Sequence, residues 1–128
     1  MAQNVATAAR KSGPFAAPLF DPASAAAILR DIDQGAERVR LAALSPRLGL
    51  TPKAQNTMIR EHLLAAERLG GRGNPYAITR DDARTLLLAA LLAVAAGVAI
   101  AVMFRGLINA GVTGKTAAEV LVRVAVPT

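Results

Sequence analysis

The chain has 128 residues, a formal net charge of +6 and no cysteine, and only 3% of its residues are aromatic. This length accommodates one small domain and excludes two independent hydrophobic cores. The lack of cysteine excludes disulfides, thiolate metal sites and a cysteine nucleophile. The low aromatic content indicates helices that pack through alanine and leucine.

Residues 1–20 contain two prolines, one glycine and no acidic side chain. No apolar stretch of signal-peptide length follows their basic pair, so we expect no secretory signal. The segment is predicted to be an extended N-terminal arm. Two interpretations stay open: the arm is disordered, or it contacts a partner through Phe15, Leu19 and Phe20.

Residues 21–70 are predicted to form an amphipathic helical hairpin. Asp21-Pro22 and Thr51-Pro52 each combine a capping side chain with a proline at the first helical position, which marks two helix starts. The first helix is expected to end near residue 44, because Ser45-Pro46 disfavours its continuation, and the second near residue 69. Apolar residues at helical spacing are expected to form the hairpin interface. They are Leu29, Ile32, Val39, Ile59 and Leu63.

Residues 71–78, rich in glycine, asparagine and proline, are predicted to form a loop before a long helix over residues 79–105. Thr79 and Asp82 match the capping-box pattern at the start of that helix. Inside it, the 19 residues 86–104 form an uninterrupted apolar run. As a helix this run is about 28 Å long, close to the hydrocarbon thickness of a bilayer. We therefore predict a membrane-spanning helix; the competing interpretation is a helix buried in protein.

Charged and aromatic side chains bracket the apolar run. Arg84 and Arg105 lie at its two ends and Tyr76 precedes it, so these three are the predicted membrane-boundary residues. The 20 residues before the run hold four basic side chains and the 20 after it hold three. By the positive-inside rule this difference favours a cytoplasmic N-terminus.

Small residues recur at every fourth position of the apolar run, which lets helix backbones approach closely. They form a predicted helix-packing face toward a second copy or a partner subunit: Ala89, Ala93, Gly97 and Ala101. Residues 106–128 are predicted to be a short C-terminal tail. Its last segment has alternating valines, as in a strand, but Thr116 and Glu119 match a capping box and favour a helix.

No catalytic, cofactor-binding or metal-binding residue is predicted. Residues 109–116 resemble a P-loop, but Asn109 stands where the motif needs glycine, so we reject nucleotide binding. His62 is the only histidine and cannot form a multi-ligand metal site alone. Basic runs are no longer than two residues and no aromatic stacking platform is present, so no nucleic-acid partner is expected.

The sequence thus predicts an all-α protein: an amphipathic helical hairpin, one long apolar helix that spans a membrane, and a short C-terminal segment. Its expected function is that of a non-enzymatic, single-pass structural or accessory subunit of a larger assembly. The expected partners are other protein subunits or a second copy, together with the lipid bilayer, and no cofactor or small-molecule substrate. Two alternatives are a phage-derived membrane-active or virion-associated protein (ejection or holin-like), and a soluble helical subunit whose apolar helix is buried in a capsid or tail assembly.

Overall fold

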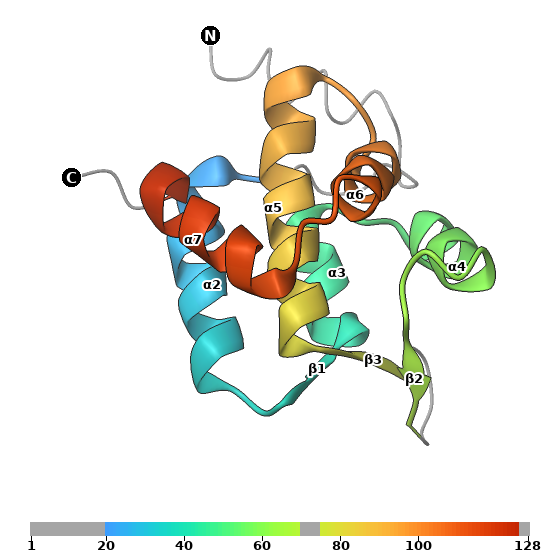
Figure 1. The fold of residues 1–128 in the computed structure, drawn as a ribbon. Helices are drawn as coiled ribbons and strands as arrows, with labels where there is room; N and C mark the ends of the chain where they lie inside the picture. Colours follow the sequence, from blue (N-terminus) through green and yellow to red (C-terminus); the bar gives the residue numbers. More distant parts are fainter. Residues whose placement is uncertain (1–19, 70–74, 126–128) are drawn as a thin grey trace, which may run out of the picture.

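The computed structural model describes residues 20–69 and 75–125, and most of these residues are helical (Figure 1). The elements follow one another as η1 (Pro22–Ser24), α2 (Ala25–Gln34), β1 (Arg38–Arg40), α3 (Leu41–Leu48), α4 (Pro52–Arg60), β2 (Glu67–Arg68), β3 (Tyr76–Thr79), α5 (Arg80–Ala96), α6 (Ile100–Asn109) and α7 (Gly114–Ala125). The prediction of a mostly helical protein is confirmed, but a small sheet joins the helices. Most of the predicted arm, including Phe15 and Leu19, lies outside the described residues, whereas Phe20 is buried in the core.

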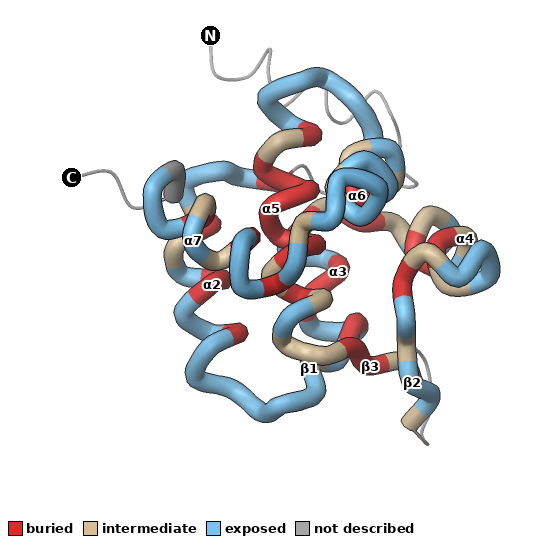
Figure 2. The backbone as a smooth tube through the Cα atoms, in the orientation of Figure 1, coloured by how far each residue is buried: buried red, intermediate tan, exposed pale blue. Residues whose placement is uncertain are grey.

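Helix α5 is the centre of the fold. It packs against α2, α6 and α7, and the residues from Thr85 to Leu91 are all buried. Figure 2 shows this burial as a continuous red stretch along α5. The helix begins where the capping pattern predicts: the backbone N–H of Asp82 donates to Oγ1 of Thr79 at 3.1 Å. The apolar run thus supplies much of the core of this chain.

The single helix predicted over residues 79–105 is wrong, because the chain turns at Gly97. This glycine has φ 70°, in the left-handed region that favours glycine, and closes α5. The carbonyl of Ala93 accepts hydrogen bonds from the backbone N–H groups of Gly97 and Val98. Helix α6 then leaves at 118° to α5.

This bend divides the helix that was predicted to span a membrane. Within residues 20–69 and 75–125, no single helix has both the length and the apolar character needed to cross a bilayer. The α5–α6 pair meets that criterion only jointly, by length and composition, across the bend.

The first predicted helix also ends early, at Gln34 instead of residue 44. Gly35 has extended backbone, and the guanidinium of Arg80, the first residue of α5, donates a hydrogen bond to its carbonyl. The chain then forms β1, and α3 begins at Leu41. Helix α3 continues through Pro46, contrary to the predicted stop at Ser45-Pro46.

A three-stranded antiparallel sheet takes the place of part of the predicted hairpin and loop. The strand order is β1-β3-β2, with Val39 opposite Ile78 and Glu67 opposite Ala77. The predicted loop 71–78 is therefore partly a strand, since β3 begins at Tyr76. The second predicted helix ends at Arg60, well before residue 69. Helix α2 packs on α5 and α7 instead of pairing with α4.

The C-terminal segment forms the helix α7, so the interpretation of its sequence as a helix is confirmed and the strand alternative is wrong. Its start differs from the predicted capping box at Thr116. Oγ1 of Thr113 accepts a hydrogen bond from the backbone N–H of Thr116 at 3.3 Å, so Thr113 supplies the capping side chain. Helix α7 packs against α5 and α2 and buries Ala117 and Leu121.

Candidate functional site

The candidate site is the pair of short helices α3 and α4 and the turn between them. Helix α3 ends at Gly49, whose φ of 72° and ψ of 22° are left-handed. Only Gly49, Leu50 and Thr51 separate the two helices. Oγ1 of Thr51 then accepts a hydrogen bond from the backbone N–H of Ala54, with Pro52 in the first turn, so α4 begins directly after the turn.

Both helices contribute buried side chains to the core. Leu44 and Leu48 of α3, Leu50 of the turn and Met58 of α4 all belong to the hydrophobic core. A buried hydrogen bond adds a directional contact: Oγ of Ser45 in α3 donates to Oε1 of Gln55 in α4 at 2.8 Å. Such a bond between buried polar groups fixes the relative position of the two helices.

The opposite face of α4 carries exposed polar and basic side chains. Lys53, Asn56 and Arg60 are exposed and stand at positions i, i+3 and i+7, which lie on one side of an α-helix. Gln55 and Met58, which face the core, are buried. We call Lys53, Asn56 and Arg60 the α4 face; in Figure 1 this helix lies at the outer edge of the molecule.

The sequence stretch that contains α4 is positively charged. Residues 38–68 hold six basic and two acidic side chains. Both acidic side chains form ion pairs: Glu61 with Arg105 of α6 at 2.9 Å, and Glu67 of β2 with Arg38 of β1 at 3.2 Å. Their negative charge is thereby largely offset by a partner.

Several of the basic side chains in this stretch have no acidic partner. Among the described residues, Arg40, Lys53, Arg60 and Arg68 form no ion pair and are exposed. Arg68 lies on β2, which follows α4 in the chain and is on the same side of the molecule in Figure 1. Lys53 and Arg60 of the α4 face therefore carry positive charge that no acidic side chain offsets.

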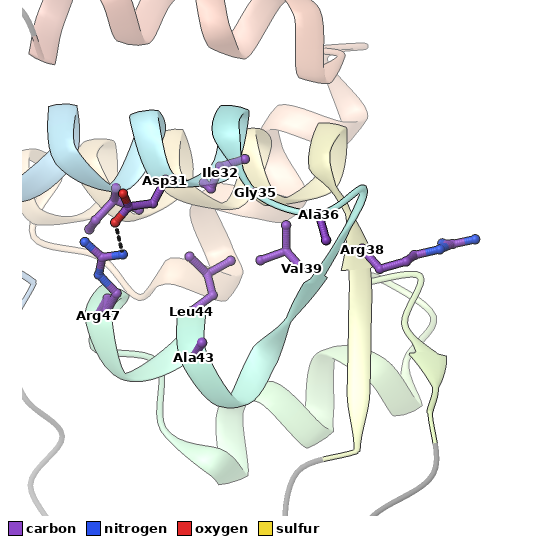
Figure 3. A pocket seen from close by; sticks show the side chains of 10 residues that line it. Asp31, Ile32, Gly35, Ala36, Arg38, Val39, Ala43, Leu44 and Arg47 are labelled. Carbon is purple, nitrogen blue, oxygen red and sulfur yellow. Dashed lines mark hydrogen bonds and ion pairs between the residues drawn. The ribbon is translucent and has the colours of Figure 1, made fainter.

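A small cavity of about 160 Å³ lies beside the candidate site, between α2, β1 and α3 (Figure 3). Val39 and Leu44 line it with apolar surface. An ion pair of 2.7 Å joins Asp31 of α2 to Arg47 of α3 at its edge, while Arg38 points away from it. The cavity presents no pair of side chains arranged for catalysis; its charged groups connect α2 to α3.

The predicted helix-packing face is divided between the core and the surface. Ala89 and Ala93 are buried inside the chain, Gly97 forms the turn and Ala101 is half-buried on α6. Because the helix bends at Gly97, the four residues do not form one straight ridge. Ala93, Gly97 and Ala101 nevertheless line a common groove between α5, α6 and the turn after α3.

The predicted membrane-boundary residues have neighbours within the protein. Arg84 forms ion pairs with Asp33 at 2.7 Å and with Asp81 at 2.9 Å. Arg105 pairs with Glu61, and Tyr76 is half-buried on β3. Two of these residues therefore act as cross-links between helices in this fold.

The predicted hairpin-interface residues do not meet as one helix pair. Leu29 and Ile32 are buried on α2, whereas Val39 lies on β1, Ile59 on α4 and Leu63 after α4. The last three are partly buried and pack against the core from different sides. The core is therefore assembled from more elements than a hairpin provides.

Two further sequence features have structural explanations. A Cβ atom on Gly114 would lie 2.4 Å from Cα of Asp81, so this glycine allows α7 to approach the start of α5. His62 follows α4 with φ 59° and is exposed. Among the described residues, no group of three or more histidine, cysteine, aspartate or glutamate side chains is arranged to hold a metal ion.

The α3–α4 site was missed because basic residues were sought as continuous runs. The available signal was Gly49-Leu50-Thr51-Pro52, a glycine stop followed within three residues by a capped helix start. The comparisons give no further guide to the site: no family model, no curated protein and no solved structure matches this chain.

Proposed function

We propose that this chain is a non-enzymatic protein that binds double-stranded DNA, with α4 as the helix that enters the major groove. The observation that carries the proposal is the α3–turn–α4 unit with its exposed α4 face. Two helices joined by a turn of three or four residues that contains glycine are the supersecondary unit of helix-turn-helix proteins. In that unit the second helix contacts base edges.

The order of the elements supports the same assignment by analogy of fold. In chain order, α2 is followed by β1, the α3–α4 unit, β2 and β3, and β1 pairs with β3. This is the topology of winged helix-turn-helix domains. In the analogy, α2 supports the unit from behind and the β2–β3 hairpin lies beside α4.

The chemistry of the α4 face suits DNA. Arginine and lysine contact phosphates or guanine, and asparagine forms a bidentate pair with adenine. Lys53, Asn56 and Arg60 offer these groups over two turns of one helix, a length that the major groove accommodates. Arg68 adds unpaired positive charge on β2, which lies on the same side of the molecule as α4 in Figure 1.

This proposal departs from the sequence-based expectation that no nucleic acid binds. That expectation rested on the lack of basic runs, but helical spacing gathers separated residues onto one face. A helix-turn-helix also needs no aromatic stacking platform, because it contacts paired bases in the groove.

The proposal is tested by measuring the dissociation constant for randomised DNA duplexes at several salt concentrations, from roughly 50 mM to 200 mM. We expect binding that weakens as salt rises. With a duplex selected from a randomised pool, replacement of Arg60 by alanine is expected to cost about 1–3 kcal/mol in binding free energy, as for one lost arginine–base contact. Lys53→Ala is expected to reduce the salt slope by about one.

Matched controls come from basic residues outside the α3–α4 unit. Arg30→Ala removes an exposed, unpaired arginine from α2, which lies on the other side of α5 in Figure 1, and Lys115→Ala removes an exposed lysine from α7. Both controls should bind like the unaltered chain. Equal weakening by Arg30→Ala and Arg60→Ala would show that only net charge matters and would contradict a role for α4.

Asn56→Ala separates base recognition from charge. The side chain is neutral, so its loss should leave the salt slope unchanged while it lowers the preference for duplexes selected from a randomised pool. If the selected sequence and the degree of discrimination stay the same, Asn56 makes no base contact.

We propose as a second candidate the membrane-associated accessory subunit expected from the sequence, with an N-terminal cytoplasmic face. Its support is the α5–α6 pair, which passes a span criterion jointly by length and composition. Flotation of the purified chain with phosphatidylcholine vesicles tests it. If the protein stays at the bottom of the gradient while the vesicles float, it does not bind the bilayer and this candidate is excluded.

A further inference from the structure

An apolar groove of about 500 Å³ lies at the α5–α6 bend, and we call it the bend groove. Among the described residues that line it, Thr51 alone has a polar side chain. An apolar cavity of about 150 Å³ holds one benzene-sized group, so the bend groove has room for roughly three large apolar side chains. Val94 and Val98 line it and are 49% and 41% exposed, so the described part of the chain leaves them uncovered.

The described part of the chain begins in the wall of the bend groove. Phe20 is its first residue, lines the groove and is buried. The preceding 19 residues are covalently attached at this point. Leu19 is the direct neighbour of Phe20, and Phe15 lies five residues before Phe20, at most about 17 Å away along an extended chain. Both side chains are therefore held within reach of the groove.

Residues 12–19 have a composition that suits an apolar groove. Their sequence, SGPFAAPL, contains no charged side chain, and Phe15 and Leu19 supply large apolar groups. Pro14 and Pro18 have no backbone N–H, so the segment brings fewer donors that need a partner in a groove with little polar surface. Proline also restricts the free chain, which lowers the entropic cost of ordering the segment.

Covalent attachment favours this segment over a separate partner of the same apolar character. A short flexible tether gives an effective concentration in the millimolar range, so a second copy at micromolar concentration needs roughly a thousandfold tighter binding to compete. Charge acts in the same direction. A second copy brings a net charge of +6 toward Arg105, which lies beside Ala101 of the groove lining, whereas residues 12–19 bring none.

We propose that the N-terminal segment of the same chain occupies the bend groove, with Phe15 and Leu19 inserted beside Val98. The arm that precedes Phe20 then binds its own chain, in place of a separate partner. Leu50 and Thr51 line the groove, so the bound segment would also cover the turn that precedes α4. This intramolecular contact does not depend on DNA binding.

A tryptophan at position 15 tests the proposal, because the chain contains no tryptophan of its own. The full-length Phe15→Trp chain is studied without DNA or lipid, over a wide range of protein concentration. Insertion removes the indole from water, so its emission should lie at a shorter wavelength than in the urea-unfolded chain. Acrylamide should quench it several-fold less than in the unfolded chain, to the same extent at every protein concentration.

Matched substitutions locate the contact. In the Phe15→Trp chain, Val98→Asp places a charge in the groove and should restore most of the quenching seen after unfolding. Val122→Asp on α7 should leave the quenching unchanged, because Val122 is 54% exposed and lies outside the bend groove. Circular dichroism checks that both variants are folded. If Val98→Asp is unfolded, the milder Val98→Ser replaces it and should also raise the quenching.

A second measurement uses the natural side chain. In the unaltered chain, nuclear Overhauser effects should connect the ring of Phe15 to the methyl groups of Val98 and persist on dilution. This measurement covers the case in which the larger indole does not fit the groove.

Three results would overturn the proposal. Quenching of Phe15→Trp equal to that of the unfolded chain, without Overhauser effects in the unaltered chain, would show that the segment does not occupy the groove. Protection that appears only as protein concentration rises would make a second copy the occupant. Protection that appears only after addition of phosphatidylcholine vesicles would make lipid the occupant. None of these samples contains DNA, so their results do not bear on the α4 proposal.

Discussion

Gly114 provides the sharpest test of the packing between α5 and α7. A Cβ atom at this position would lie 2.4 Å from both Cα and Cβ of Asp81 and 2.6 Å from its carbonyl oxygen. All three distances are far below van der Waals contact, and two of the atoms belong to the backbone of α5. Gly114→Ala therefore requires α7 to move away from α5 or the start of α5 to distort.

The expected magnitude follows from two opposing effects. Overpacking in a well-packed core costs about 1–3 kcal/mol, and backbone atoms favour the upper part of that range. Alanine recovers about 0.5–1 kcal/mol relative to glycine in a helix. The net loss in the free energy of unfolding is about 1–2 kcal/mol, which lowers Tm by roughly 4–8 °C for a domain of this size.

Thermal unfolding followed by circular dichroism measures this loss. Gly106 is the matched control, because it lies within α6 and a Cβ atom there meets nothing within 4 Å. Gly106→Ala should therefore raise stability slightly. If Gly114→Ala also stabilises the chain, α7 does not pack closely on Asp81, and the glycine at position 114 has another cause.

Two further predictions concern helix starts and pH. Thr113→Ala should cost about 1 kcal/mol of stability, because the Thr113 hydroxyl caps α7, and Thr116→Ala should cost less. Urea unfolding of both variants measures the two losses. A larger loss for Thr116→Ala would show that Thr116, as the sequence pattern predicted, caps the helix. Burial, and then the charge of Asp81, raise the pKa of the Asp82 carboxyl above its ordinary value of 3.8. Above both pKa values the charged form of Asp82 therefore costs folding free energy, and this cost disappears as pH falls through the raised pKa toward 3.8. The stability advantage of Asp82→Asn over the unaltered chain should shrink over that interval, whereas a difference that does not change with pH would contradict the raised pKa.

Local signals predicted the helix starts well. Thr51 and Thr79 each cap a helix through a backbone N–H three residues later, so the interaction lies within the window that a sequence pattern covers. Asp21 acts over a similarly short range, because its carboxylate accepts a hydrogen bond from the backbone N–H of Ala23, two residues later. Interactions of this range depend little on the rest of the fold.

Helix ends were predicted poorly because a distant contact accompanies one of them and a single glycine conformation sets another. Gly35 leaves α2 where Arg80, 45 residues away, binds its carbonyl. Gly97 was counted as a small residue compatible with a helix, but its left-handed conformation ends α5. An average of hydropathy over residues 86–104 does not detect one residue that turns the chain.

The sheet and the α4 face were missed for different reasons. Strands β1 and β2 have three and two residues, too short for alternation to be visible. Lys53, Asn56 and Arg60 are separated by two and three other residues, so they form no cluster in the linear sequence. A projection of residues 52–60 onto a helix would have grouped them.

A nuclear magnetic resonance titration of the labelled full chain with a selected DNA duplex tests most directly whether α4 contacts DNA. If α4 enters the major groove, the largest amide shift changes should fall within residues 51–60 and at Arg68, with small changes on α7. Changes concentrated on α7 or α2, or no changes at a DNA concentration well above that of the protein, would contradict a contact between α4 and DNA.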